Sequence, residues 1–238
     1  MGNRFQEVLQ GRPVILGHRG SPEKAQENSI QSFLLALEDG ADGVELDVHG
    51  TSDGELIVFH DENLSDGRYI REHTYPEVKI ASQRQKVVVH RLEKVFRALA
   101  GKGFINIELK SKGLEANVLR LARDLLPPDT FLFSSFIPDT VAECRKLAAD
   151  VPAIFIRVEP EALDSELECI RRIEASGVAY HHSQIDDKLA AFFKENKVPL
   201  FTWTVNDIAE AKRLEALGIS GIITDRPAEL MKYFKGVK

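Results

Sequence analysis

Short apolar runs alternate with amphipathic stretches along almost the whole chain. A short apolar run bounded by turn residues is typical of a buried strand, and apolar residues three or four positions apart are typical of a helix with one buried face. The pattern therefore predicts repeated strand–helix units and a parallel sheet. Eight strands are expected, at residues 14–18, 43–48, 104–110, 130–134, 152–158, 178–182, 198–205 and 220–224.

Eight helices are expected between these strands. Several of them are followed by glycine, which favours the left-handed conformation in which many helices end. We expect that conformation at Gly40, Gly101, Gly177 and Gly218. The predicted helices cover residues 29–39, 92–100, 114–126, 138–149, 162–175, 186–196, 207–217 and 227–235.

The number of units favours a closed barrel. Dividing 238 residues by eight gives about 30 residues per unit, close to the size of a unit in a (β/α)8 barrel. The alternative is a doubly wound open sheet. It is disfavoured because no Gly-x-Gly-x-x-Gly phosphate loop follows the first strand, where dinucleotide-binding sheets carry one. We therefore expect an α/β fold, a single (β/α)8 TIM barrel that forms one catalytic domain over residues 1–238.

One segment departs from this rhythm. Residues 51–90, between the second strand and the second helix, form an insertion in which Asp53-Gly54 predicts a tight turn. Residues 56–60 predict an extra strand, and the polar residues that follow are expected to lie over the barrel mouth. No stretch rich in Pro, Gly or Ser marks a linker to a second domain.

Composition and charge exclude several classes of protein. Hydrophobic residues make up 43% and charged residues 29%, as in folded globular chains. The formal net charge is −6 and no block of Lys and Arg stands out, which argues against a nucleic-acid partner. Cys144 and Cys169 are too few for a disulfide framework, so a packing role in a reducing cytoplasm is expected. No run approaches the ~18 apolar residues of a membrane-spanning helix, and no secretion signal is recognised.

Acidic residues interrupt two of the predicted strands. Side chains alternate faces along a strand, so the apolar residues of the second strand share one face and Glu45 and Asp47 share the other. The outer face of a barrel meets the helices, so both acids are expected to point inward. The third strand repeats the pattern and places Asn106, Glu108 and Lys110 inside. Three carboxylates are therefore expected to meet in the barrel interior.

Buried carboxylates need compensation, since each unpaired one costs several kcal/mol. Three carboxylate ligands suit a hard divalent ion, Mg²⁺ or Ca²⁺, better than zinc. A divalent metal bound by Glu45, Asp47 and Glu108 is thus the first hypothesis. Two alternatives stay open. The acids could form salt bridges with Lys110 or Arg19, or they could lie on a solvent-exposed antiparallel edge, where the same alternation is harmless.

Two histidines follow predicted strands at their carboxyl ends, where barrel enzymes hold catalytic groups: His18 and His60. A single histidine there would more often be structural. A pair of imidazoles, however, titrates in the range where one can act as base and the other as acid in displacement at phosphorus. Arg19 and Lys110 are candidates for phosphate binding, because a guanidinium fork and an ammonium both pair with phosphate oxygens.

The other histidines carry no such pattern. His49, His73 and His90 are expected on the surface, on or beside the insertion. His181 and His182 are adjacent on one predicted strand and should therefore point to opposite faces, so at most one of them faces the barrel interior. No role is assigned to either.

A set of motifs spans almost the whole chain. They are His18-Arg19-Gly20, Glu27-Asn28-Ser29 with Phe33, Glu45-Leu46-Asp47-Val48, Asp53-Gly54, His60-Asp61, Glu108-Leu109-Lys110, Trp203-Thr204-Val205-Asn206 and Thr224-Asp225-Arg226-Pro227. In kind and in order they resemble the motifs of the glycerophosphodiester phosphodiesterase family. The resemblance is more specific than any single motif.

The resemblance implies a (β/α)8 barrel that hydrolyses a small glycerophosphodiester to glycerol 3-phosphate and an alcohol, through a cyclic phosphate. It implies a divalent metal at the three acids, an acid/base pair of His18 and His60, and phosphate binding by Arg19 and Lys110. Trp203 would form an apolar wall for the glycerol carbons, although a core tryptophan is nearly as common.

Several positions differ from the family's usual residues: Ser29, Glu62-Asn63-Leu64, His90-Arg91 and Ser220. They leave the released alcohol open without removing a proposed catalytic group. Two other functions also stay open. One is a lysophospholipase D or related lipid phosphodiesterase, and the other is a non-catalytic barrel that binds phosphorylated ligands. The oligomeric state cannot be predicted from the sequence.

Overall fold

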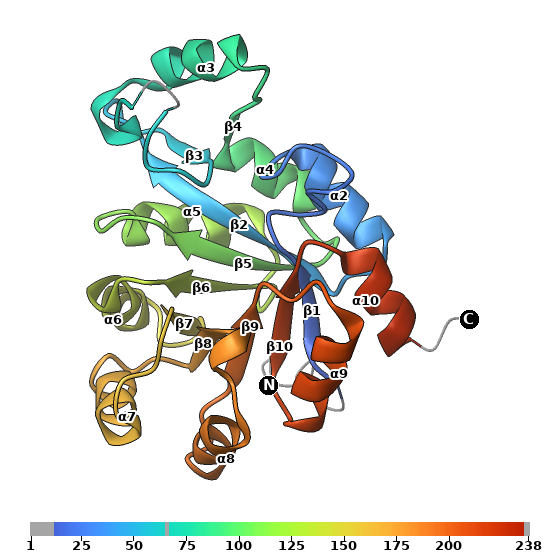
Figure 1. The fold of residues 1–238 in the computed structure, drawn as a ribbon. Helices are drawn as coiled ribbons and strands as arrows, with labels where there is room; N and C mark the ends of the chain where they lie inside the picture. Colours follow the sequence, from blue (N-terminus) through green and yellow to red (C-terminus); the bar gives the residue numbers. More distant parts are fainter. Residues whose placement is uncertain (1–11, 65–66, 236–238) are drawn as a thin grey trace.

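The computed structural model describes residues 12–64 and 67–235. In this part of the chain eight parallel strands form a closed barrel, because β1 pairs with β2 on one side and with β10 on the other (Figure 1). These strands are β1 (Val14–Gly17), β2 (Gly43–Gly50), β5 (Phe104–Leu109), β6 (Phe131–Ser135), β7 (Ala153–Arg157), β8 (Gly177–His181), β9 (Leu200–Trp203) and β10 (Gly221–Thr224). The predicted (β/α)8 barrel is confirmed.

Helices surround the barrel and bury its outer face (Figure 1). They are α2 (Ile30–Glu38), α4 (Leu92–Leu99), α5 (Glu115–Leu125), α6 (Pro138–Leu147), α7 (Leu163–Arg172), α8 (Asp187–Glu195), α9 (Ile208–Ala216) and α10 (Pro227–Phe234). Each predicted strand and helix is present with its ends shifted by a few residues. Val44, Leu46 and Val48 lie in the core beneath the helices, as the alternation along the second strand predicts.

The insertion is present between β2 and α4, but it is more ordered than its polar sequence suggested. Strand β3 (Leu56–Val58) pairs antiparallel with β2, and β4 (His90–Arg91) pairs with β3. A 3-10 turn, η1 (Ile70–Glu72), and a helix, α3 (Tyr75–Arg84), follow β3. Neither was predicted.

Helix α3 had a recognisable start signal in the sequence. Thr74 and Glu77 form a capping box, in which the side chain of each residue accepts a hydrogen bond from the backbone N–H of the other. Only one narrow face of the helix is apolar. Val78 and Ala81 pack there in a small separate core with residues of β3, the loop after it, η1 and the segment before β4: Ile57, Leu64, Ile70 and Val89. The helix is therefore stabilised by tertiary contacts rather than by strong amphipathicity.

The predicted left-handed glycines are confirmed at three positions and wrong at one. Gly40, Gly101 and Gly218 have φ angles of 91°, 74° and 77°. Gly177 does not lie in the left-handed region. It begins β8, where a Cβ atom would lie 2.8 Å from the carbonyl oxygen of Pro199, so close approach of two strands explains the glycine.

The two cysteines are free thiols, of which Cys144 is buried. Burial raises the pKa of the Cys144 thiol to about 12, with smaller contributions from Glu115 and Glu143, so it behaves as a packing group. None of the described helices combines the length and apolarity that crossing a bilayer requires.

An ion pair between the partly exposed Arg157 and the buried Glu166 links the end of β7 to α7. Arg157 Nη2 lies 2.7 Å from Glu166 Oε1, which also accepts the backbone N–H of Glu161 at 2.8 Å. Tyr180 lies next to this pair, and burial together with the Glu166 charge raises the pKa of its hydroxyl. The pair lies between the barrel and its helices, so its role is stability and not chemistry.

Replacing Glu166 by glutamine is expected to destabilise the protein by about 2 kcal/mol, because the variant leaves the Arg157 charge without its buried partner. Such a loss corresponds to a fall of about 4–8 °C in the thermal unfolding midpoint. Calorimetry or circular dichroism measures it. Glu161→Gln removes the other partner of Arg157, a side chain that is 67% exposed, and should change stability by less than about 0.5 kcal/mol. Equal effects of the two substitutions would contradict this assignment.

Candidate active site

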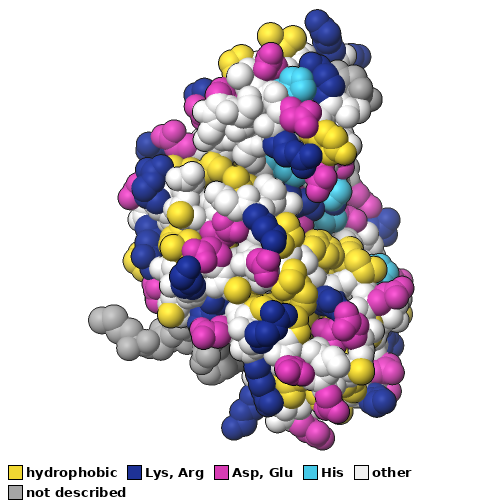
Figure 2. Space-filling view, turned by 90° about the vertical axis from the view of Figure 1, so that its left-hand side faces the viewer, with side chains coloured by type: hydrophobic (Ala, Val, Ile, Leu, Met, Phe, Trp, Pro, Cys, Tyr) yellow, Lys and Arg dark blue, Asp and Glu magenta, His cyan; other side chains and the backbone are white. Residues whose placement is uncertain are grey.

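A cavity opens at the carboxyl ends of the barrel strands, with about 780 Å³ of empty space when its open mouth is included. The structure brings the predicted site residues together there. Seven of them line the cavity: His18, Arg19, Glu45, His60, Glu108, Lys110 and Trp203. The eighth, Asp47, lies within ion-pair distance of Arg19 and Lys110. Figure 2 views the molecule from the side toward which β2 and β5 point, and histidine side chains lie there beside a hydrophobic patch.

The two histidines reach the cavity by different routes. His18 directly follows the barrel strand β1. His60 follows β3, which is not a barrel strand but the antiparallel partner of β2. The backbone N–H of Phe59 donates to the carbonyl oxygen of Asp47 at 3.1 Å, so the insertion returns the chain to the barrel mouth just before His60. The insertion therefore supplies one of the candidate catalytic side chains.

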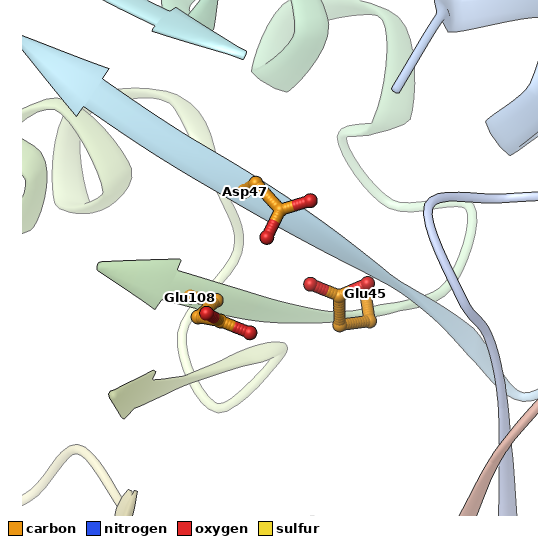
Figure 3. Close-up of side chains that lie close together, drawn as sticks. All are labelled: Glu45, Asp47 and Glu108. Atoms are coloured by element: carbon orange, nitrogen blue, oxygen red, sulfur yellow. The ribbon is translucent and has the colours of Figure 1, made fainter. Parts of the chain in front are cut away.

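The three predicted acids meet inside the barrel (Figure 3). Glu45, Asp47 and Glu108 each offer a carboxylate oxygen, and these oxygens lie within 4.8 Å of one another. Their residues are only 3%, 1% and 8% exposed. The alternative of a solvent-exposed edge is therefore wrong.

Burial acts differently on the three carboxyl groups. It raises the pKa of Glu45 well above the usual value, and the charges of Asp47 and Glu108 add to the effect. The pKa of Glu108 is also raised, by burial and by Asp47. Burial disfavours the Asp47 charge too, but Lys110, Arg19 and the Asn28 amide outweigh it and lower the pKa of Asp47.

Salt bridges compensate the acids only in part. Lys110 Nζ lies 2.7 Å from Glu108 Oε1 and 3.3 Å from Asp47 Oδ1, and Arg19 Nε lies 3.4 Å from Asp47 Oδ2. Glu45 makes no such ion pair in the described part of the chain. Its Oε2 accepts the backbone N–H of Arg19 at 2.9 Å, and its buried Oε1 has no partner.

These residues fit a divalent cation. Three carboxylates face two cationic side chains, and the unpartnered oxygen of Glu45 lies among the three. Oxygen ligands of this kind are the ones that Mg²⁺ and Ca²⁺ prefer. The salt bridges predicted as an alternative exist, but they leave Glu45 uncompensated.

A carboxylate orients His18. Its Nδ1 lies 2.7 Å from Asp225 Oδ1, and Asn206 Nδ2 donates to Asp225 Oδ2 at 2.7 Å. The amide oxygen of Asn206 in turn accepts the backbone N–H of Asp225 at 2.9 Å. Burial opposes the Asp225 charge, but the hydrogen bonds from His18 and Asn206 lower its pKa. The ring of His18 is thus held with Nδ1 as donor, which leaves Nε2 to act in the cavity.

Neither Asp225 nor Asn206 was given a role from the sequence. Both lie in recognised motifs, and Asp225 directly follows the last barrel strand, at the end where catalytic groups gather. That position was the available signal. This position could not reveal which residue Asp225 contacts, because His18 lies 207 positions away in the chain.

Asp225→Asn is expected to lower kcat by about one to two orders of magnitude with little change in KM. The amide keeps the shape of the carboxylate but holds His18 Nδ1 less firmly as a donor, so the ring would no longer be fixed in the tautomer that proton transfer through Nε2 would require. Steady-state kinetics measures this. Combined with His18→Gln, the substitution should add almost nothing further, because Asp225 would act only through the His18 ring. Fully additive losses would show that Asp225 does not act through His18.

His60 is oriented by two other groups. Its Nδ1 lies 2.7 Å from Asp61 Oδ1, and its carbonyl oxygen lies 3.1 Å from the Nε2 of His49. The prediction that His49 is a surface residue is wrong, because it is 95% buried and burial lowers its pKa. His49 lies two residues after Asp47 on β2 and so on the same inward face as Glu45 and Asp47. That spacing was the sequence signal for its burial.

Arg19 and Lys110 line the cavity but pair with carboxylates in this structure. Besides Asp47, Arg19 contacts Glu27, with Nη1 at 3.0 and 3.1 Å from its two carboxylate oxygens. Lys110 pairs with Glu108 and Asp47. Arg19 has a φ of 52°, a conformation that directs its backbone N–H to Glu45.

Aromatic side chains border the cavity on the side of β6, β8 and β9. Trp203 makes edge contacts with Phe136 at 5.6 Å and with His181 at 5.4 Å between ring centroids. The expectation that His181 and His182 point to opposite faces is wrong, because β8 ends at His181 and the chain turns into a 3-10 helix, η2 (His182–Gln184). Their rings lie 4.5 Å apart, and His182 pairs with Glu210.

Comparison with known proteins gives one consistent result. The model of the glycerophosphoryl diester phosphodiesterase family matches residues 18–229. A glycerophosphodiester phosphodiesterase of Caldanaerobacter subterraneus subsp. tengcongensis is 30% identical over 245 residues, covering 92% of this chain and 97% of that protein. The crystal structure of such an enzyme from Thermotoga maritima is 27% identical with a TM-score of 0.80, covering 94% of this chain and 99% of that one. A phosphodiesterase of Oleispira antarctica, in complex with the product sn-glycerol-3-phosphate, is 25% identical with a TM-score of 0.84, covering 96% and 99%.

Proposed function

The chain belongs to the glycerophosphoryl diester phosphodiesterase family, and we propose that it hydrolyses glycerophosphodiesters to glycerol 3-phosphate and an alcohol with a divalent metal and two histidines. The supporting observation is the meeting of three buried carboxylates, His18 and His60 at one cavity. The product held by the Oleispira antarctica relative supports the same small-molecule substrate class.

Glu45, Asp47 and Glu108 would hold the ion, Mg²⁺ or Ca²⁺. When bound, the ion supplies positive charge that offsets the charge building on the phosphoryl oxygens and lowers the pKa of a hydroxyl beside it. Arg19 and Lys110 line the same cavity and would pair with the phosphate oxygens.

The two histidines would divide the proton transfers. One takes the proton of the glycerol hydroxyl next to the phosphate-bearing carbon as that oxygen attacks phosphorus, and the other protonates the departing alcohol oxygen. The resulting cyclic phosphate is then opened by water with the two roles exchanged. Asp225 and Asp61 each hold one ring nitrogen, which presents the other nitrogen for transfer.

A substrate panel with and without chelator tests this function. Glycerophosphocholine, glycerophosphoethanolamine, a lysophospholipid and bis(p-nitrophenyl) phosphate are incubated with the purified protein, and released products are followed. We expect the glycerophosphodiesters to be cleaved, the activity to be lost with chelator, and Mg²⁺ or Ca²⁺ to restore it. Turnover that persists in chelator would contradict the metal, and no turnover of any diester would favour the non-catalytic binding barrel.

A lysophospholipase D is the second candidate, and one observation favours it. Phe136 at the cavity is 39% exposed and contacts Trp203, so the mouth offers an aromatic surface to the acyl chain that a lysophospholipid carries on its glycerol group. The same panel separates the two functions. Faster cleavage of the lysophospholipid than of glycerophosphocholine would assign the lipid substrate.

A further inference from the structure

Two buried polar side chains in the cavity take no part in the chemistry proposed above. Asn106 on β5 and Ser134 on β6 are 4% and 2% exposed, and both line the cavity. Asn106 Oδ1 and Ser134 Oγ have no hydrogen-bond partner among the described residues. An unmade buried hydrogen bond costs about 1–3 kcal/mol, so such atoms are uncommon in native proteins.

The strand register places these two groups next to the carboxylates. Asn106 is the partner of Glu45 across β2 and β5, and Ser134 is the partner of Glu108 across β5 and β6. The side chains that line the cavity beside them are apolar, among them Leu132 and Ile154. The two side chains therefore contribute an amide and a hydroxyl to the part of the cavity between the carboxylates and these apolar residues.

The hydrogen-bonding groups of Asn106 and Ser134 favour a neutral hydroxyl as their ligand. The Asn106 carbonyl oxygen needs a donor, and the Ser134 hydroxyl can donate or accept. A single alcohol O–H that donates to Asn106 and accepts from Ser134 satisfies both. A phosphate dianion brings acceptor oxygens but no donor for the Asn106 carbonyl oxygen, and an apolar carbon would leave both hydrogen bonds unmade.

Building on the proposed function, we propose that Asn106 and Ser134 form a subsite for the terminal hydroxyl of the substrate's glycerol group. This is the hydroxyl that does not attack phosphorus. The subsite makes the enzyme selective for glycerol diesters over diesters of an otherwise identical diol that lacks this hydroxyl, because a site with unpaired buried polar groups rejects the deoxy analogue.

The test compares two substrates in wild type and variants. One is glycerophosphocholine, and the other is the matching diester of propane-1,2-diol, which keeps the attacking hydroxyl and lacks the terminal one. We expect wild type to prefer the glycerol substrate by at least about tenfold in kcat/KM. Ser134→Ala and Asn106→Leu should each reduce that preference by about fivefold or more, and the double variant should show almost none.

A matched control separates recognition from folding. Ser82 is also buried with an unpartnered Oγ, but it lies in α3 of the insertion and does not line the cavity. Ser82→Ala should leave the preference unchanged. A second measurement does not depend on turnover. Calorimetry should show that Ser134→Ala weakens binding of glycerol 3-phosphate more than binding of propane-1,2-diol 1-phosphate.

Three outcomes would overturn the proposal. Wild type that cleaves both substrates equally well has no such subsite. Variants that lose the same factor on both substrates would show that the two side chains only support Glu45 and Glu108. In both cases the phosphodiesterase function stands, because wild type turns over. If wild type cleaved neither of the two substrates, the proposed function and this subsite would be overturned together.

Discussion

Glu45→Gln is expected to reduce kcat/KM on glycerophosphodiesters by at least about a thousandfold, while the metal-free protein stays at least as stable as the parent. Glutamine keeps the size of the side chain and removes one of three carboxylate ligands. It also removes a carboxyl group whose charged form is disfavoured by burial and by the charges of Asp47 and Glu108, which together raise the pKa of Glu45. The Glu45→Gln variant should therefore lose activity without losing stability.

Thermal unfolding adds a readout that does not require turnover. A ligand that binds only the folded state at about 100 times its dissociation constant stabilises that state by about 2.7 kcal/mol. The midpoint of the parent should therefore rise by about 5–10 °C with excess Mg²⁺ or Ca²⁺ over its value in chelator. The rise should be much smaller in Glu45→Gln.

Glu166→Gln is the matched control, because it also neutralises a buried glutamate, but one outside the cavity. It should show the opposite pattern, with a lower midpoint in chelator and normal turnover of the folded protein. A fully active Glu45→Gln variant, or one whose midpoint responds to the ion as the parent's does, would refute the metal site.

His18→Gln and His60→Gln are each expected to lower kcat by about 100- to 10,000-fold, the usual range for loss of a general acid or base. The two variants should differ in their response to the leaving group. On a glycerol diester of p-nitrophenol, whose anion departs without a proton, the variant that lacks the general acid should recover most of its activity. The variant that lacks the base should not. Comparing both variants on this diester and on glycerophosphocholine assigns the roles.

His73→Gln is the control for this pair, because His73 lies in the insertion and does not line the cavity. Its kinetics should match wild type on both substrates. If both cavity variants lost the same factor on both substrates, the division into acid and base would be wrong. If either variant retained full activity, that histidine would have no part in proton transfer.

Much of the barrel could be predicted because its signals are local. Apolar runs recur in each unit, glycines follow three of the helices, and the alternation along a strand decides which face a side chain takes. The same rule placed Glu45 and Asp47 inside before any contact was known, and it would also have placed His49 there. Helix α3 was missed although its capping box was readable, because the polar character of the insertion was given more weight than its start signal.

The sequence by itself determined the order of the elements and the face on which each acid lies, since both follow from spacing along a few neighbouring residues. Only the tertiary structure decided which side chains the two histidines meet. Closing the barrel places β1 beside β10, and this brings His18 to Asp225 across 207 positions of chain. The pairing of β3 with β2 likewise brings His60 to the mouth. Such contacts depend on closure of the whole sheet, and no local pattern specifies them.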